Sequence, residues 1–252
     1  MKDITIKSNK DLEGRIWTNP DSNKGIVVAH SFRNSFEEPV CLEASQGFHK
    51  QGYNVLTINL VGHGKSAGGL RDVSLRAVSE NVSSAIKYLK EIGVDNIGAY
   101  AISLGTSATI LSKERPMAQV FLSPSPLFNP RLLLDRYSNV INPQREGLEE
   151  RGYAIVQSGS GRGNFEIGQE WINEMESGKM QTQETHMKNK TPTLIIQGTK
   201  DDLTDVAQVR KLINRFGDSS LIIYGADHNF SRQSHRDTVI KKASEWFGKY
   251  LN

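Results

Sequence analysis

Residues 96–105 read NIGAYAISLG, and the rest of the chain can be read outward from this stretch. The apolar run 97–102 has the length of a buried parallel strand. A helix-like segment, 104–114, follows at once and stops before Pro116. Ser103 stands at the junction, with a small residue two positions before it and another two positions after it. The stretch therefore predicts a sharp strand–turn–helix reversal that exposes the serine hydroxyl at the carboxyl edge of a sheet.

A literal Gly-x-Ser-x-Gly motif occurs elsewhere, at residues 64–68, with Ser66 at its centre. It follows a loop instead of a strand and precedes glycines instead of a helix. Patterns this short arise by chance about once in several hundred residues, so structural context decides between them. We therefore favour Ser103 over Ser66 as a nucleophile, since the helix that follows Ser103 would also offer free N–H groups to an oxyanion.

The composition limits the classes of function that the chain can have. With 252 residues it fits one large domain or a domain with an insertion. Its 31 basic and 28 acidic residues are too balanced to predict nucleic acid or a membrane surface as a partner, and its apolar runs are too short to span a bilayer. Residues 1–11 lack the apolar segment of a signal peptide, and the single Cys41 fits a reducing compartment, so we expect a cytoplasmic chain. The scattered histidines give no metal-ligand spacing, and we expect no metal or cofactor.

Strand-like apolar runs alternate with amphipathic helix-like segments along most of the chain. Strands are predicted at residues 4–7, 12–17, 25–30, 53–60, 97–102, 118–122, 193–197 and 220–224. Helices are predicted at residues 39–50, 74–92, 104–114, 204–216 and 234–251. This alternation predicts an α/β fold with a mostly parallel sheet that helices cover on both faces.

The alternation breaks in residues 127–190, which are long, polar and irregular for a loop within a compact domain. Segments 153–157 and 164–168 could form a hairpin around a glycine-rich turn, followed by a short helix at 170–176. We predict that residues 127–190 are a lid inserted into a core made of 1–126 and 191–252.

The predicted lid carries several aromatic residues, among them Phe165 and Trp171. Aromatic walls are typical of pockets for acyl or aryl groups, so we expect these two side chains to contact the substrate. The alternative is a surface insertion whose aromatic residues pack only against one another.

Polar residues follow the carboxyl ends of the predicted strands, where ligands bind in parallel sheets. Asp201 follows the strand at 193–197, and His228 follows the strand at 220–224. Together with Ser103 they give the chain order serine, acid, histidine, each after its own strand. Asp202 is the alternative acid.

Five segments carry a resemblance to a known family. They are His30-Ser31-Phe32, GHGKSAG at 62–68, AISLG at 101–105, GTKDD at 198–202 and GADHNFS at 225–231. Their order resembles that of α/β-hydrolases of the serine-aminopeptidase-like group, and the pattern is similar to cinnamoyl and feruloyl esterases. The sequence departs from the family pattern at Ser31 and Ala101, where glycine is usual, and at 59–61, where an acid and an arginine are usual.

The resemblance implies an α/β-hydrolase fold with an inserted lid, and a serine hydrolase that cleaves small acyl or aryl esters. In this family Ser103 would be the nucleophile and His228 its base. The family's Gly-x-x-Asp spacing favours Asp201 as the acid that orients the histidine. The backbone N–H groups of Phe32 and Leu104 would form the oxyanion hole.

Other functions stay open at this point. A thioesterase or an aminopeptidase-like amidase would use the same three residues, and fold alone does not separate these activities. A hydrolase-like binding protein is disfavoured because it has no need of the complete set. The partner we expect is a small-molecule ester, and a homodimer is compatible with a sequence that does not set the oligomeric state.

Overall fold

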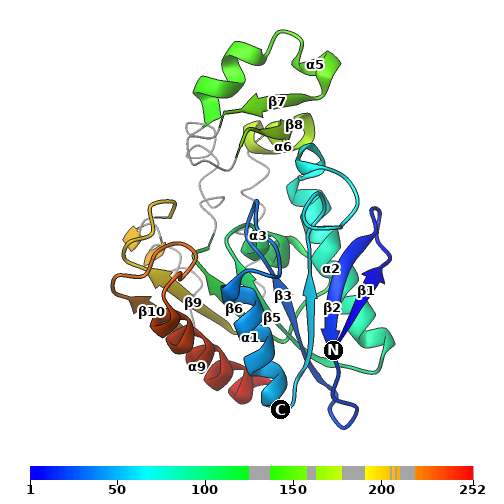
Figure 1. The fold of residues 1–252 in the computed structure, drawn as a ribbon, viewed down its shortest axis with the longest axis vertical. Helices are drawn as coiled ribbons and strands as arrows, with labels where there is room; N and C mark the ends of the chain where they lie inside the picture. Colours follow the sequence, from blue (N-terminus) through cyan, green and yellow to red (C-terminus); the bar gives the residue numbers. More distant parts are fainter. Residues whose placement is uncertain are drawn as a thin grey trace.

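The computed structural model describes residues 1–124, 137–157, 163–177, 191–204, 206–207, 209–210 and 219–251 (Figure 1). Within these residues, eight strands form one sheet in the order β1-β2-β4-β3-β5-β6-β9-β10. The strands are β1 (Lys2–Ile6), β2 (Leu12–Trp17), β3 (Lys24–Ala29), β4 (Asn54–Ile58), β5 (Asn96–Ile102), β6 (Ala118–Leu122), β9 (Thr193–Gly198) and β10 (Ser219–Ile223). Of the described strand pairs in this sheet, β1–β2 and β2–β4 are antiparallel and the other five are parallel, so the predicted, mostly parallel sheet is confirmed.

Helices cover both faces of the sheet. On one face α1 (Pro39–Lys50) packs against α9 (Gln233–Tyr250), and on the other α2 (Leu75–Glu91) packs against α3 (Leu104–Leu111). Alternate residues of a strand enter alternate layers, as the pleat requires. In β3, Ile26 and Val28 pack with α1 and α9, whereas Val27 and Ala29 pack with α2 and α3. The two faces therefore enclose two apolar clusters.

Two helix predictions need comment. The segment predicted at 104–114 ends as a helix at Leu111, because Ser112 leaves the helical conformation and hydrogen-bonds to Glu114 O. The helix predicted at 204–216 lies largely outside the described residues.

Within the segment predicted to be an insertion, the described residues 137–157 and 163–177 form a small separate sheet with flanking helices. Strands β7 (Tyr153–Val156) and β8 (Phe165–Gly168) pair antiparallel, which confirms the predicted hairpin. Flanking them are η3 (Asn142–Gln144), α5 (Leu148–Arg151) and α6 (Gln169–Glu176). In Figure 1 this unit stands above the end of the sheet at which β5 leads into α3.

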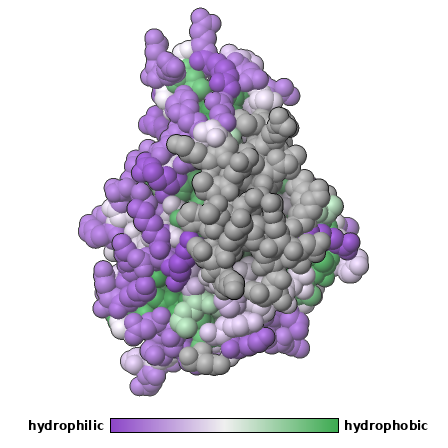
Figure 2. Space-filling model, turned by 180° about the vertical axis from the view of Figure 1, so that it is seen from behind, coloured by the Kyte–Doolittle hydropathy of each residue, from purple (hydrophilic) through white to green (hydrophobic). Residues whose placement is uncertain are grey.

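No helix in the described part of the chain is long and apolar enough to cross a bilayer. On the face in Figure 2, the coloured residues are mainly hydrophilic, and hydrophobic ones gather in small patches.

Candidate active site

Ser103 occupies a sharp reversal between β5 and α3. Its backbone has φ 49° and ψ −112°, a conformation that non-glycine residues adopt only where the surrounding structure enforces it. Its N–H donates to Leu122 O in β6 at 3.0 Å, which fixes the turn on the neighbouring strand. A Cβ at Gly105 would lie 2.5 Å from the carbonyl oxygen of Ala29, so only glycine fits on the inner side of the turn. The local geometry is therefore that of the predicted strand–turn–helix reversal.

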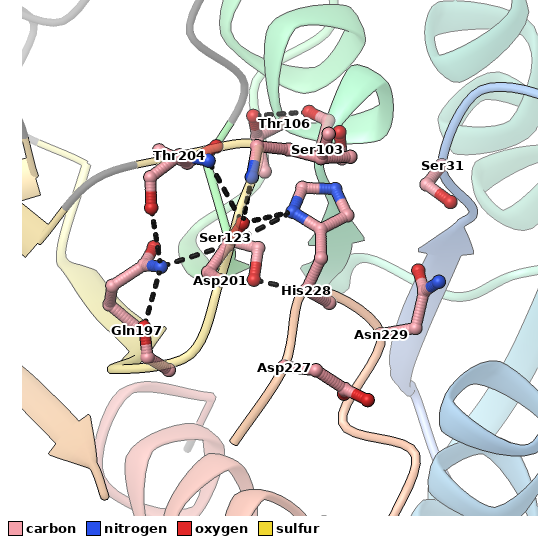
Figure 3. Close-up of polar contacts among 12 residues, drawn as sticks. Ser31, Ser103, Thr106, Ser123, Gln197, Asp201, Thr204, Asp227, His228 and Asn229 are labelled. Atoms are coloured by element: carbon pink, nitrogen blue, oxygen red, sulfur yellow. Dashed lines mark hydrogen bonds and ion pairs between the residues drawn. The ribbon is translucent and has the colours of Figure 1, made fainter. Parts of the chain in front are cut away.

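His228 and Asp201 are in direct contact beside this turn. The Nδ1 atom of His228 lies 2.9 Å from both carboxylate oxygens of Asp201, and the histidine is 6% exposed. In Figure 3 the imidazole lies between Asp201 and Ser103, with its second nitrogen on the side of the serine. The alternative acid, Asp202, is exposed, and it is Asp201 that holds the histidine's Nδ1. The structure thus brings together the three side chains that the sequence singled out.

Asp201 accepts hydrogen bonds from several groups in addition to His228. Gln197 Nε2 donates to its Oδ2 at 2.9 Å, and the N–H groups of Leu203 and Thr204 donate to its Oδ1 at 2.9 and 2.8 Å. Burial by itself would raise the pKa of Asp201, but these bonds, led by that from His228, outweigh burial and hold the pKa below its ordinary value. Asp201 is therefore an ionised carboxylate that can stabilise an imidazolium.

The loop that carries His228 is fastened by residues that the sequence analysis did not single out. Ser123 follows β6 with φ 42°, and its Oγ donates to the carbonyl oxygen of His228 at 3.0 Å. Asn34 Nδ2 contacts Ser31 Oγ at 2.7 Å and Asn229 Oδ1 at 3.4 Å, which joins the loop after β3 to the histidine loop. The contact between Asn34 and Ser31 joins residues that are close in the sequence. The contacts of Asn34 with Asn229 and of Ser123 with His228 join distant segments, so no pattern along the chain indicates them.

The candidate oxyanion donors follow two neighbouring parallel strands, Phe32 after β3 and Leu104 after β5. Leu104 is the first residue of α3, where a backbone N–H has no acceptor within its own helix. Phe32 lies in the turn after β3, and among the described residues its N–H has no backbone acceptor. Among the described residues, neither N–H is thus committed to another backbone group.

Two buried histidines hold the loop around Phe32. His30 accepts Leu60 N–H at Nε2 and donates from Nδ1 to its neighbour's carbonyl, Ser31 O, at 2.7 Å. His63 likewise accepts Arg33 N–H at Nε2, at 2.9 Å, and donates from Nδ1 to Val61 O. Each ring must then be neutral with its proton on Nδ1.

Burial opposes protonation of both rings. Burial, with the nearby His63 as a smaller cause, lowers the pKa of His30 to about 3. Burial also lowers the pKa of His63, against the smaller opposing effect of its backbone hydrogen bonds. These histidines are structural supports, and their bonding leaves neither ring available as a second base.

Ser66, the rival nucleophile, has its hydroxyl engaged on both sides. Its Oγ donates to Asn59 O at 2.6 Å and accepts the N–H of Glu13 at 2.9 Å, and the residue is 7% exposed. A hydroxyl held in this way links the glycine-rich turn to β2 and has no evident route to a substrate.

Phe165 and Trp171, which the sequence analysis placed in a predicted lid, lie against Phe32. Phe165 is in β8 and Trp171 in α6, and they are only 9% and 4% exposed. Both rings meet the Phe32 ring edge to face. Among the described residues, no group of histidine, cysteine, aspartate and glutamate side chains is arranged to hold a metal ion.

Comparison with known proteins gives structural matches alone. The sequence matches no family model and no curated protein. A putative hydrolase from Agrobacterium vitis S4 matches with a TM-score of 0.78 at 15% identity, over 98% of each chain. Est1E from Butyrivibrio proteoclasticus matches with a TM-score of 0.77 at 17% identity, over 100% of this chain and 99% of that one. The chain has the α/β-hydrolase fold.

Other structures with this fold extend the comparison. Est1E has also been solved with ferulic acid bound, and that structure matches with a TM-score of 0.75 at 18% identity, over 98% and 99% of the two chains. The esterase Pf2001 from Pyrococcus furiosus matches with a TM-score of 0.70 at 18% identity, over 100% of this chain and 91% of that one. Several structures that share this fold are thus named as esterases or hydrolases.

Proposed function

We propose that this chain is a serine hydrolase that cleaves small carboxylic esters, with Ser103, His228 and Asp201 as its catalytic triad. The observation that supports this most directly is the contact between His228 and Asp201 at 2.9 Å, next to a serine on a strained turn. A binding protein would gain nothing from holding an ionised acid, a histidine and a serine in this order.

In the proposed reaction, His228 Nε2 takes the proton of Ser103 Oγ as that oxygen attacks the ester carbonyl. The resulting oxyanion would accept hydrogen bonds from the N–H groups of Phe32 and Leu104. His228 then gives the proton to the departing alkoxide, which leaves an acyl-enzyme and a free alcohol. A water molecule, deprotonated by the same histidine, hydrolyses the acyl-enzyme and restores Ser103. Asp201 stays ionised and stabilises the imidazolium in both steps.

The substrate class that we propose is a small acyl or aryl ester. The presence of ferulic acid in an Est1E structure makes hydroxycinnamate esters a reasonable group to test first. Thioesters and amides pass through the same kind of tetrahedral intermediate, so an acyl-CoA and an aminoacyl p-nitroanilide belong in the same panel. Residues 127–190 would act as a lid on the core formed by 1–126 and 191–252.

The test compares Ser103→Ala with Ser66→Ala. We expect Ser103→Ala to lower kcat for p-nitrophenyl acetate by several orders of magnitude, because no other group can form the acyl-enzyme. Ser66→Ala should keep most of the activity of the molecules that fold, although losing two hydrogen bonds makes the fold about 1–3 kcal/mol less stable.

Thermal unfolding of both variants separates loss of chemistry from loss of fold. A fluorophosphonate that labels serine nucleophiles should mark the wild type and Ser66→Ala but leave Ser103→Ala unlabelled. An active Ser103→Ala variant, or an inactive and well-folded Ser66→Ala variant, would overturn the proposed site.

A further inference from the structure

The side chain of Phe32 is surrounded by three rings from two other parts of the chain. Its ring centroid lies 5.7 Å from His63, 5.6 Å from Phe165 and 5.0 Å from Trp171, and each pair meets edge to face. This is the preferred geometry of aromatic pairs. We call His63, Phe165 and Trp171 the aromatic clamp. These three rings pack around Phe32, whose backbone N–H is one of the two proposed oxyanion donors.

The next residue, Arg33, needs the same support. Its φ of 59° places it in the left-handed region, which a non-glycine residue keeps only when its surroundings hold it there. The supports come from the clamp: its N–H donates to His63 Nε2 at 2.9 Å, and its guanidinium lies 4.4 Å from the centroid of the Phe165 ring. Its Nη2 also donates to Gly163 O at 3.1 Å. The strained peptide thus depends on contacts with the insertion.

The lid half of the clamp is itself anchored to the core. Glu174 in α6 accepts the N–H groups of Leu75 and Arg76 at the start of α2, at 2.6 and 3.0 Å. Glu170 pairs with the Arg76 guanidinium through two hydrogen bonds. A Cβ at Gly168 would lie 1.8 Å from Arg71 O, so β8 approaches η1 (Leu70–Asp72) as closely as glycine allows. These contacts give Phe165 and Trp171 a fixed base.

Trp171 is oriented by its ring contacts. It is 4% exposed, and within the described residues its indole N–H has no acceptor. Phe165 is 9% exposed, so neither ring keeps much surface for a substrate. Phe32, which they hold, is only partly buried.

We propose that Phe165 and Trp171 are positioning residues that act through Phe32, fixing its N–H where the oxyanion forms. The inference rests on the proposed esterase function and gives these two residues a role different from direct reading of the substrate. A clamp that acts on the oxyanion serves every substrate alike, because each ester develops the same negatively charged oxygen.

The test uses Trp171→Leu, Phe32→Leu and the double variant, with p-nitrophenyl esters of increasing acyl length and a hydroxycinnamate ester. We expect Trp171→Leu to lower kcat by about tenfold to hundredfold for every ester with KM nearly unchanged. Removing a whole oxyanion donor costs about 100- to 1000-fold, which sets the upper bound. Because Trp171 acts through Phe32, the double variant should fall little below the worse single variant.

Binding of a phenylboronic acid provides a readout that general weakening of the fold would not mimic. This inhibitor forms a tetrahedral adduct whose oxygen occupies the oxyanion hole, so its affinity should fall in parallel with kcat. Ile172→Ala is the matched control, since Ile172 is the next residue of α6, is fully buried and points about 100° away around the helix. It should lower the melting temperature without lowering kcat of the folded protein. Trp171→Phe, which keeps an aromatic edge, should recover most of the activity.

The outcomes separate the two proposals. If the wild type hydrolyses no ester, the proposed function is wrong, and the role of the clamp, which rests on it, is wrong as well. If the wild type is active but Trp171→Leu changes the ratio of kcat/KM between short acyl and bulky aryl esters, the residue reads the substrate and the clamp is wrong. Additive effects of the two single variants, or an equal loss of kcat in Ile172→Ala, would also overturn it. If Trp171→Leu does not fold, Phe165→Leu with Phe32→Leu supplies the same cycle.

Discussion

His30 is the residue through which we expect mild acid to destabilise this fold. Its ring is 1% exposed and joins two loops by donating to Ser31 O and accepting Leu60 N–H. A second proton would have to enter on Nε2, where it meets the N–H of Leu60, and the resulting cation would lack water. The pKa of about 3 expresses this cost.

The size of the effect follows from proton linkage. The unfolded chain protonates His30 below about pH 6.5, whereas the folded chain does so only below about pH 3. The stabilisation is therefore complete above pH 6.5 and is lost as the pH falls through this window. At pH 5 the loss is about 2 kcal/mol, from about 1.5 pH units at 1.36 kcal/mol each, and near pH 3 it reaches roughly 5 kcal/mol.

Other groups change this figure in known directions. Burial also lowers the pKa of His63, so its protonation adds a loss of the same sign. Most carboxylates contribute little between pH 8 and 5, because their ordinary pKa values of about 4 lie below that window. Glu174, whose pKa is raised mainly by burial, contributes a change of the opposite sign. The expected loss over that range is thus about 2 kcal/mol.

Urea unfolding at pH 8 and pH 5 measures the effect. The wild type should lose about 2 kcal/mol of unfolding free energy, with a similar dependence on urea at both pH values. His30→Gln should start less stable at pH 8, because its amide cannot reproduce both hydrogen bonds. Its loss between pH 8 and 5 should be smaller than that of the wild type by about 2 kcal/mol. Equal losses in the two proteins would refute the reasoning.

Two further predictions concern Asp201 and the turn at Ser103. Gln197→Leu removes the amide that donates to Asp201 Oδ2 at 2.9 Å. The value of kcat/KM for p-nitrophenyl acetate at pH 8 should therefore fall by about tenfold. An unchanged value would show that the amide does not orient the carboxylate. Gly105→Ala places a Cβ 2.5 Å from the backbone oxygen of Ala29, so it should destabilise the fold by about 1–3 kcal/mol or more in thermal unfolding. The control is Gly248→Ala in α9, where the added Cβ meets nothing within 4 Å. This change should stabilise the fold by up to about 1 kcal/mol. Equal effects of the two changes on thermal unfolding would contradict the steric account.

The sequence determined the features that depend on neighbours along the chain. Apolar runs and helical periodicity predicted the parallel sheet, because burial on both faces of a strand and on one face of a helix writes a regular pattern. The same local patterns placed Ser103 between a strand and a helix. This context favoured Ser103 over Ser66, although Ser66 lies in the literal Gly-x-Ser-x-Gly motif. Asp201 and His228 could be proposed because residues that follow parallel strands gather at one edge of the sheet.

The tertiary structure alone decided what those side chains meet. Phe165 and Trp171 are more than 130 positions from Phe32 in the sequence, and no periodicity records that their rings close around it. The amide of Gln197 on Asp201 and the hydroxyl of Ser123 on the histidine loop are likewise visible only once separate strands lie side by side. Hydrogen bonds and ring contacts are directional and short in range, so they are set by the packing of distant segments. A linear pattern of apolar and polar residues carries no information on that packing beyond which side of an element is buried.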